Sequence, residues 1–356
     1  MQLLYKNEDA YIMYTEKYNI LNCKYIIDNY NTEMQPYGWQ DFLGNSSGYS
    51  TTWVTSAILS FSYGFLPEFI LENFKKQFRL FIHPDNGVGY SLSTLSDCDS
   101  TVFFIKACLA LNISPRFVVD QIQFILNHQC DNGGFRTYLS EDLLGNWKSN
   151  KYLRFRGWTS DHTCVSSAVL DLFASHNYFQ SNYFEHISRL LSYLSMKQNE
   201  DGSLDSYWWY TKYYSTIYTL NALLKLNKKD SVLFKNAKNF VLDTFSKNFW
   251  TNGISNEPCI LSSALCLDFL INDDYYENKN MVDNGVSFLL RSMNQSDGSW
   301  TSNPILKIPD PDTLPNVEQN YIFNGRGVGT CSNDPFNLYT TSLIARVLNN
   351  YQHYST

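Results

Sequence analysis

The segment Gln198-Asn199-Glu200-Asp201-Gly202-Ser203 ends one amphipathic stretch of the chain and begins a loop. Asp-Gly and Asn-Gly pairs favour tight turns with positive φ. Comparable turns recur along the sequence, and their glycines are Gly38, Gly87, Gly133, Gly202, Gly253 and Gly298. They lie mostly about 45–50 residues apart, a spacing typical of structural repeats. The sequence therefore predicts a repeat protein in which each unit contains one such turn.

Two kinds of helical stretch alternate with these turns. Amphipathic stretches precede them, at approximately residues 16–30, 67–82, 114–129, 180–198, 231–247 and 280–293. Stretches with little charge follow them, at approximately residues 50–64, 98–111, 159–174, 213–226, 258–271 and 336–349. A helix that is apolar nearly all round is a buried helix. The pattern predicts an all-α fold, an (α/α)6 toroid of six inner and six outer helices, and one domain spanning residues 1–356.

In such a toroid every glycine turn leads from an outer helix into an inner one. All of these turns therefore lie at the same end, and the N-termini of the inner helices surround one mouth. Two connections at that end are long, residues 139–157 and 301–334. Because long loops usually carry function or cover a site, we expect the functional site at this mouth.

The composition limits the class of protein. A net charge of −7 argues against a general nucleic-acid-binding protein. The N-terminus has no apolar signal core, and no apolar run approaches the roughly 20 residues of a membrane-spanning helix. The 8 cysteines are scattered without a CxxC pair, as in proteins with reduced thiols. We expect a cytoplasmic protein without an integral membrane segment, and the sequence leaves peripheral membrane contact and the oligomeric state open.

Asp97-Cys98-Asp99-Ser100-Thr101 lies where a strongly apolar stretch begins. Asp, Ser and Thr cap helix N-termini, so one interpretation of this segment is a helix cap. A single cap needs only one oxygen, however, and several suitable side chains occur here together. The other interpretation is a carboxylic acid at the positive end of a helix, beside a second carboxylate, facing an aromatic cavity.

The turn copies at residues 198–203, 294–300 and 129–135 resemble the Q-x-x-D-G-x-W repeats of squalene-hopene cyclases and protein-prenyltransferase β-subunits. This resemblance covers essentially the full length. Within that superfamily, residues 97–101 resemble the D-x-D-D-T motif of class II terpene cyclases, whose middle Asp protonates a terminal alkene or epoxide. The resemblance makes Asp99 the proton donor and Asp97 its partner.

The chain departs from the family pattern at two places. Ser100 replaces the last Asp of the motif, so Ser100 and Thr101 are candidates for supporting the acid. Ser160-Asp161-His162-Thr163 resembles the segment that opens the next inner helix in squalene-hopene cyclases. There a His one turn later hydrogen-bonds the catalytic Asp, whereas this chain has Val165. Asp161 and His162 are therefore further candidates for supporting the acid.

Chain length makes the protein similar to the single-domain class II meroterpenoid cyclases, which cyclise a prenyl chain attached to an aromatic acid. A carbocation needs a dry cavity, in which each aromatic face contributes about 0.5–2 kcal/mol. The aromatic candidates are Trp53, Phe104, Trp158, Trp208, Trp209, Tyr210, Tyr214, Trp300, Phe336 and Tyr339. The cationic candidates for an anionic head group are Lys148, Lys151, Arg154, Arg156 and Arg326.

Three alternatives share the toroid. A prenyltransferase-like zinc site would need a late His, which residues 336–349 lack. A glycoside hydrolase would pair Asp97 or Asp99 with Asp161, and a binding toroid without catalysis would tolerate replacement of Asp99. The apolar inner stretches favour a cyclase that binds a hydrophobic isoprenoid. Such an enzyme needs no metal or other cofactor, except Mg²⁺ if the head group is a diphosphate.

Overall fold

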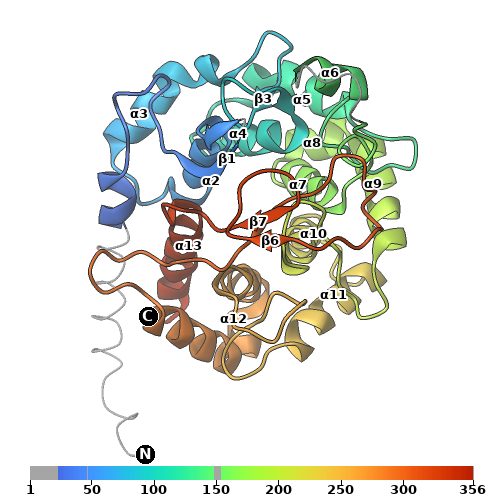
Figure 1. Cartoon of the computed structure of the whole chain (residues 1–356). Coiled ribbons are helices and arrows are strands. Elements are labelled where there is room, and N and C mark those ends of the chain that lie inside the picture. Colours follow the sequence, from blue (N-terminus) through green and yellow to red (C-terminus); the bar gives the residue numbers. More distant parts are fainter. Residues whose placement is uncertain (1–22, 46, 148–153, 356) are drawn as a thin grey trace, which may run out of the picture.

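The computed structural model describes residues 23–45, 47–147 and 154–355, and the chain is mostly helical (Figure 1). Residues 23–28 are helical and belong to the first predicted amphipathic helix, whose earlier residues lie outside the described part. Lys148 and Lys151, two of the cationic candidates, also lie outside it.

The weakly charged stretches form the buried helices. They are α2 (Thr52–Ser62), α4 (Cys98–Ala110), α7 (Thr163–Ala174), α10 (Tyr213–Lys225), the first part of α12 (Ile260–Arg291) and α13 (Leu338–Ser355). Each contacts the next in this order, and α13 returns to α2, so the contacts follow a closed path. In α7 every residue after the first is buried, as predicted for a helix that is apolar all round.

The amphipathic stretches form helices that bury only one face. They are α3 (Glu68–Gln77), α5 (Val119–Asn127), α9 (Phe184–Lys197), α11 (Val232–Asp243) and the second part of α12, beyond a kink at Asp274. In α9 the buried side chains are Ile187, Leu190, Tyr193 and Leu194, which form one stripe. A short helix, α8 (Asn177–Asn182), precedes α9.

In two of the repeated turns, a glutamine connects the turn to the next amphipathic helix. The side-chain Nε2 of Gln198 donates to the carbonyls of Gly202 and Leu233, at 3.0 Å each, and Leu233 lies at the start of α11. Gly202 has φ +85°, and a Cβ there would lie 2.2 Å from the carbonyl oxygen of Asn236. The turn therefore needs glycine both for its backbone conformation and for its close approach to α11.

Tryptophans of the repeats anchor the turns to the preceding amphipathic helices. The indole N–H groups of Trp39, Trp250 and Trp300 donate to the carbonyls of Ile26, Val241 and Leu289, at 2.7 Å each. Trp300 is fully buried in this packing and does not line the cavity described below. Its role in the described structure is therefore to hold the repeat together.

The connections that lead into the buried helices contain short strands, which the all-α prediction did not include. They are β1 (Asp41–Gly44), β2 (Gly48–Ser50), β3 (Val88–Gly89), β4 (Ser96–Asp97), β5 (Leu306–Ile308), β6 (Ile322–Phe323) and β7 (Thr330–Ser332). Strands of two to four residues are too short to give an alternating pattern in the sequence.

The long connection at residues 301–334 forms the sheet β5-β7-β6, in which β5 is antiparallel and β6 parallel to β7. A bridge between Trp209 and Leu306 ties this sheet to the segment before α10, and Figure 1 shows β6 and β7 lying across the centre of the molecule. The other long connection contains α6 (Glu141–Trp147). Within the described ranges, no helix has both the length and the apolar character needed to cross a membrane.

Candidate active site

Asp97 is the N-cap of α4. Its carboxylate accepts hydrogen bonds from the backbone N–H and the hydroxyl of Ser100, both at 2.7 Å. The hydroxyl of Thr101 donates to the Asp97 carbonyl at 2.7 Å and accepts from the N–H of Val88 at 2.9 Å. Ser100 and Thr101 therefore hold Asp97 and the adjacent strand, and the capping interpretation applies to Asp97 rather than to Asp99.

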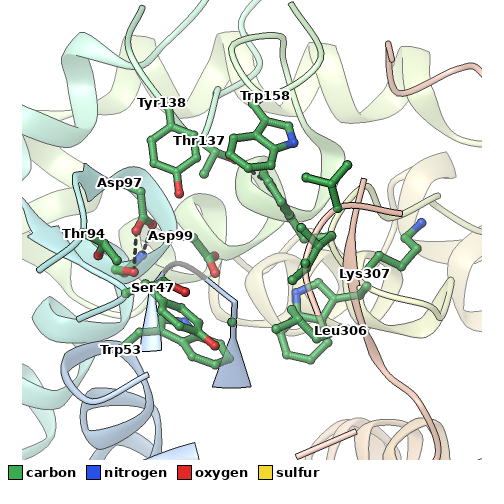
Figure 2. Close-up of a pocket in the computed structure, with 18 of the residues that line it drawn as sticks. Ser47, Trp53, Thr94, Asp97, Asp99, Thr137, Tyr138, Trp158, Leu306 and Lys307 are labelled. Carbon is green, nitrogen blue, oxygen red and sulfur yellow. Dashed lines mark hydrogen bonds between the residues drawn. The ribbon is translucent and has the colours of Figure 1, made fainter. Parts of the chain in front are cut away.

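Asp99 is the second residue of α4, and its side chain lines a cavity of about 320 Å³. The cavity is lined by mostly apolar side chains from α2, from the loops at the mouth and from β5. Figure 2 shows Asp99 near its middle, with Tyr138 and Trp158 on one side and Trp53 on the other. Its size is within the range of small-molecule binding pockets.

The carboxyl of Asp99 is protonated at neutral pH. Burial and the negative charge of Asp97 raise its pKa from 3.8 to about 8, although Lys106 and the indole of Trp53 act in the opposite direction. Burial likewise raises the pKa of Asp97 to about 7, against the hydrogen bonds from Ser100. Among the described residues, Asp99 Oδ1 has no hydrogen-bond partner. A neutral acid facing an apolar cavity is able to donate a proton into it.

Four tryptophan rings form part of the cavity wall. Trp53, Trp158, Trp208 and Trp209 line it, and the Trp158 and Trp208 ring centroids are 5.5 Å apart. Tyr214 and Tyr339 do not line it. They lie behind the wall, where Tyr214 stacks on Trp209 at 4.2 Å and Tyr339 stacks on Trp53 at 5.4 Å.

Three other aromatic candidates lie elsewhere. Phe104 packs toward α3 against Phe74, Phe78 and Phe81. Tyr210 contacts Tyr321 and Phe323 of the mouth sheet, and Phe336 packs against Tyr49. None of these side chains lines the cavity, because each is turned toward a neighbouring helix or loop.

Asp161 and His162 support the site only indirectly. The carboxylate of Asp161 accepts from the Tyr193 hydroxyl at 2.7 Å and pairs with Lys197 at 3.3 Å. Burial lowers the pKa of His162 to about 4, so its imidazole is neutral. In the described hydrogen bonds, neither residue contacts Asp99.

The imidazole of His162 instead orients Trp208. Its Nε2 lies 2.8 Å from the Gly157 carbonyl, which only accepts, so this nitrogen carries the proton. Its Nδ1 consequently accepts from the Thr137 hydroxyl at 2.7 Å, and that hydroxyl accepts from the indole N–H of Trp208 at 2.7 Å. Thr137 was not recognisable in the sequence, because its contacts join segments that are distant in the chain.

The described cationic candidates differ in their exposure and in their ion pairs. Arg156 forms a bidentate pair with Asp312, at 2.6 and 3.0 Å, and Arg154 is exposed. Arg326 is exposed and directly precedes Gly327 and Val328, which line the cavity. It therefore lies at the rim.

Lys307 and Tyr138 also line the cavity, and the sequence analysis missed both. The Lys307 ammonium donates to the Ser206 carbonyl at 2.6 Å, and Figure 2 shows it directed away from Asp99. Tyr138 stacks on Trp158 at 5.9 Å. Within the residues that the structure covers, no group of three or more His, Cys, Asp or Glu side chains is arranged as a metal site.

The sequence matches no protein-family model and none of the curated proteins. Its fold, however, is that of solved type II terpene cyclases. Two structures of MstE variants from Scytonema superpose on this chain with TM-scores of 0.83 at 22% identity. One holds geranylgeranyl dihydroxybenzoate as substrate, and the other holds merosterolic acid A as product. The alignment with the substrate complex covers 99% of this chain and 100% of MstE, and that with the product complex covers 99% of each.

Two more distant structures share the fold. The ent-copalyl diphosphate synthase from Streptomyces platensis has a TM-score of 0.60 and 14% identity, over 84% of this chain and 50% of that one. The GH76 α-mannanase BT2949 from Bacteroides thetaiotaomicron has a TM-score of 0.58 and 13% identity, over 96% of each chain. At these identities the likeness concerns the fold.

Proposed function

We propose that this chain is a class II terpene cyclase, which converts a linear prenyl chain attached to an aromatic acid into a polycyclic isomer. The observation that carries the proposal is Asp99, a carboxyl held neutral beside a cavity walled by tryptophan rings. The closed path of helix contacts supports the finer description of the fold, a single domain over residues 1–356 with six inner and six outer helices.

In the proposed reaction, Asp99 transfers its proton to the terminal alkene of the substrate. A C–H bond forms, Asp99 becomes a carboxylate and the alkene becomes a tertiary carbocation. Each following alkene attacks the cation and forms a ring C–C bond. Loss of one proton from the last cation to solvent gives a neutral product, and the Asp99 carboxylate takes up a proton from solvent, so the substrate is isomerised without a cofactor. A carboxyl with a pKa of about 8 enters this cycle already protonated.

The cavity wall suits the carbocation. The faces of Trp53, Trp158, Trp208 and Trp209 offer cation–π attraction of about 0.5–2 kcal/mol each. Their faces also present no lone-pair oxygen or nitrogen to the cation. Asp97 stays beside the acid as a partner whose charge keeps the pKa of Asp99 high.

The head group is proposed to be an aromatic acid at the rim. MstE, with the same fold over the full length, binds geranylgeranyl dihydroxybenzoate. Arg326 lies at the rim of this chain's cavity, beside Gly327 and Val328, and suits a planar carboxylate. Arg154 and Arg156 are weaker candidates for binding the head group. Neither lines the cavity, and Arg156 is already paired with Asp312.

A glycoside hydrolase is the alternative with a structural relative, the GH76 α-mannanase. The mostly apolar cavity favours the cyclase, because sugar-binding sites need polar groups for the many hydroxyls of their ligand. Asp161 is also tied to Tyr193 and Lys197, so it is not available as the second carboxyl.

Product analysis by mass spectrometry tests the proposal. Wild type, Asp99→Asn and the control Asp120→Asn, an exposed α5 carboxylate, would each receive geranylgeranyl dihydroxybenzoate, geranylgeranyl diphosphate and squalene. We expect wild type and Asp120→Asn to form a ring-containing isomer of unchanged mass from the aromatic substrate, and Asp99→Asn to form none. Equal activity of Asp99→Asn, or no cyclisation of any substrate, would refute the proposal.

A further inference from the structure

In the cavity wall and directly behind it, several buried polar atoms near the candidate acid have no hydrogen-bond partner among the described residues. Among the described residues, the atoms with no hydrogen bond include Trp53 Nε1, Asp99 Oδ1 and the hydroxyls of Tyr214 and Tyr339. A buried polar atom without a partner is destabilising, so such atoms are rare in folded proteins. Tyr339 stacks directly on Trp53, and both tyrosines interact electrostatically with Asp99.

The indole of Trp53 is held in place by its neighbours. Its ring lies nearly parallel to Tyr339, at 5.4 Å and 16°, and nearly parallel to Tyr90, at 6.2 Å and 15°. It extends from the first turn of α2, whereas Asp99 extends from the first turn of α4. A ring packed in this way keeps the direction of its N–H through a reaction cycle.

Trp53 Nε1 and Asp99 Oδ1 are chemically complementary. An indole N–H only donates and an ionised carboxylate only accepts. Both side chains line the same cavity, and the indole N–H favours the ionised form of Asp99, although the two atoms do not form a hydrogen bond in the resting geometry. Catalytic hydrogen bonds are often long in the resting protein and shorten as charge develops.

We propose that the indole N–H of Trp53 donates to Asp99 Oδ1 as the carboxylate forms, and so makes Asp99 a stronger acid. Trp53 is then the positioning residue that supports the acid, in a chain that has Val165 where the family resemblance leads one to expect a His. This inference rests on the proposed role of Asp99 as the proton donor. It adds a donor role to the ring's cation–π role.

The expected pH dependence has a definite sign. Activity requires protonated Asp99, so the rate falls as the pH rises through its pKa. Loss of the Trp53 donor destabilises the carboxylate, which raises the pKa of Asp99 and weakens the acid. We therefore expect kcat to fall about 10- to 100-fold while the alkaline limb moves up by about one pH unit. The other titratable groups that interact with Asp99 are Asp97, Lys106, Cys98, Cys164, Tyr138, Tyr214, Tyr218 and Tyr339.

Each variant removes one hydrogen-bond donor, and the decisive variant also keeps the shape of the Trp53 ring. In Trp53→Phe the N–H is lost with part of the ring. Site-specific replacement of Trp53 by 3-benzothienylalanine keeps the bicyclic shape and replaces the N–H by sulfur. Tyr339→Phe and Tyr214→Phe, the matched controls, remove the other unpaired donors. For wild type and each variant, the experiment measures kcat, KM, the pH–rate profile and the melting temperature.

A second readout does not depend on turnover. The titration of Asp99 is followed by 13C NMR of carboxyl-labelled protein and assigned by difference with Asp99→Asn. The proposal is supported if the benzothienyl variant moves this titration and the alkaline limb to higher pH while the tyrosine variants do not. It is overturned if the benzothienyl variant titrates as wild type does, or if only the tyrosine variants shift. If wild type cyclises nothing, the proposed function fails, whereas the NMR result still reports on the Trp53–Asp99 pair.

Discussion

Replacing Asp99 by Asn removes an ionisable group that the fold keeps protonated. The pKa of Asp99 is raised from 3.8 to about 8, so the folded protein binds this proton more tightly than the unfolded chain. Between these two values the unfolded carboxyl ionises while the folded one does not. The free energy of unfolding of the wild type therefore falls as the pH rises. An Asn side chain does not titrate, so the variant lacks this contribution to the fall.

The size of the effect follows from the shift. Each pH unit corresponds to about 1.4 kcal/mol, so the interval from pH 5 to 8.5 spans about 4 kcal/mol at most. Because Asp97 titrates nearby with a pKa of about 7, we expect about 3 kcal/mol from Asp99 itself. For a chain of 356 residues, with an unfolding entropy of about 2.1 cal/mol/K per residue, this corresponds to about 4 °C in Tm.

Thermal unfolding at pH 5 and pH 8.5, at one scan rate, measures the difference. We expect Asp99→Asn to melt about 4 °C higher relative to wild type at pH 8.5 than at pH 5. The exposed control Asp120→Asn should follow the wild type at both values. Parallel pH dependences of wild type and Asp99→Asn would show that the carboxyl is not held protonated by the fold, and the reasoning would fail.

Two further variants test the rim and the wall. Arg326→Gln should raise KM for a substrate with a carboxylate head group about 10-fold or more, with kcat nearly unchanged. Steady-state kinetics with the acid and with its methyl ester would reveal whether the enzyme recognises the negative charge. Thr137→Val removes the hydroxyl between His162 and Trp208, so the ring should lose its fixed orientation. We expect a larger share of incompletely cyclised products by mass spectrometry, and an unchanged product mixture would argue against that role of Thr137.

Local chemistry was enough for the sequence to predict the helical elements. The exposed and buried helices coincide with the two kinds of stretch, because a 3.6-residue pattern records which face of a helix is buried. The turns at Gly133 and Gly202 were likewise recognisable, since their positive φ demands glycine. The expectation of a mainly helical fold, similar to that of class II terpene cyclases, was confirmed.

The sequence also singled out Asp97 and Asp99, because one cap needs only one oxygen and the segment resembles the D-x-D-D-T motif. It did not separate their roles. Only the tertiary structure decided that Asp97 accepts the capping hydrogen bonds from Ser100, whereas Asp99 Oδ1 is left without a partner among the described residues. Capping is a matter of backbone geometry around one turn, which the residue types alone do not specify.

Which aromatic side chains wall the cavity was also decided by the tertiary structure. Trp53 and Trp300 were both candidates for the cavity wall on the sequence alone. One lines the cavity, and the other donates to Leu289 inside a repeat. Helix rotation and the course of the mouth loops set that difference, through contacts between residues far apart in the chain. Local patterns record burial, but they do not record what a buried side chain faces.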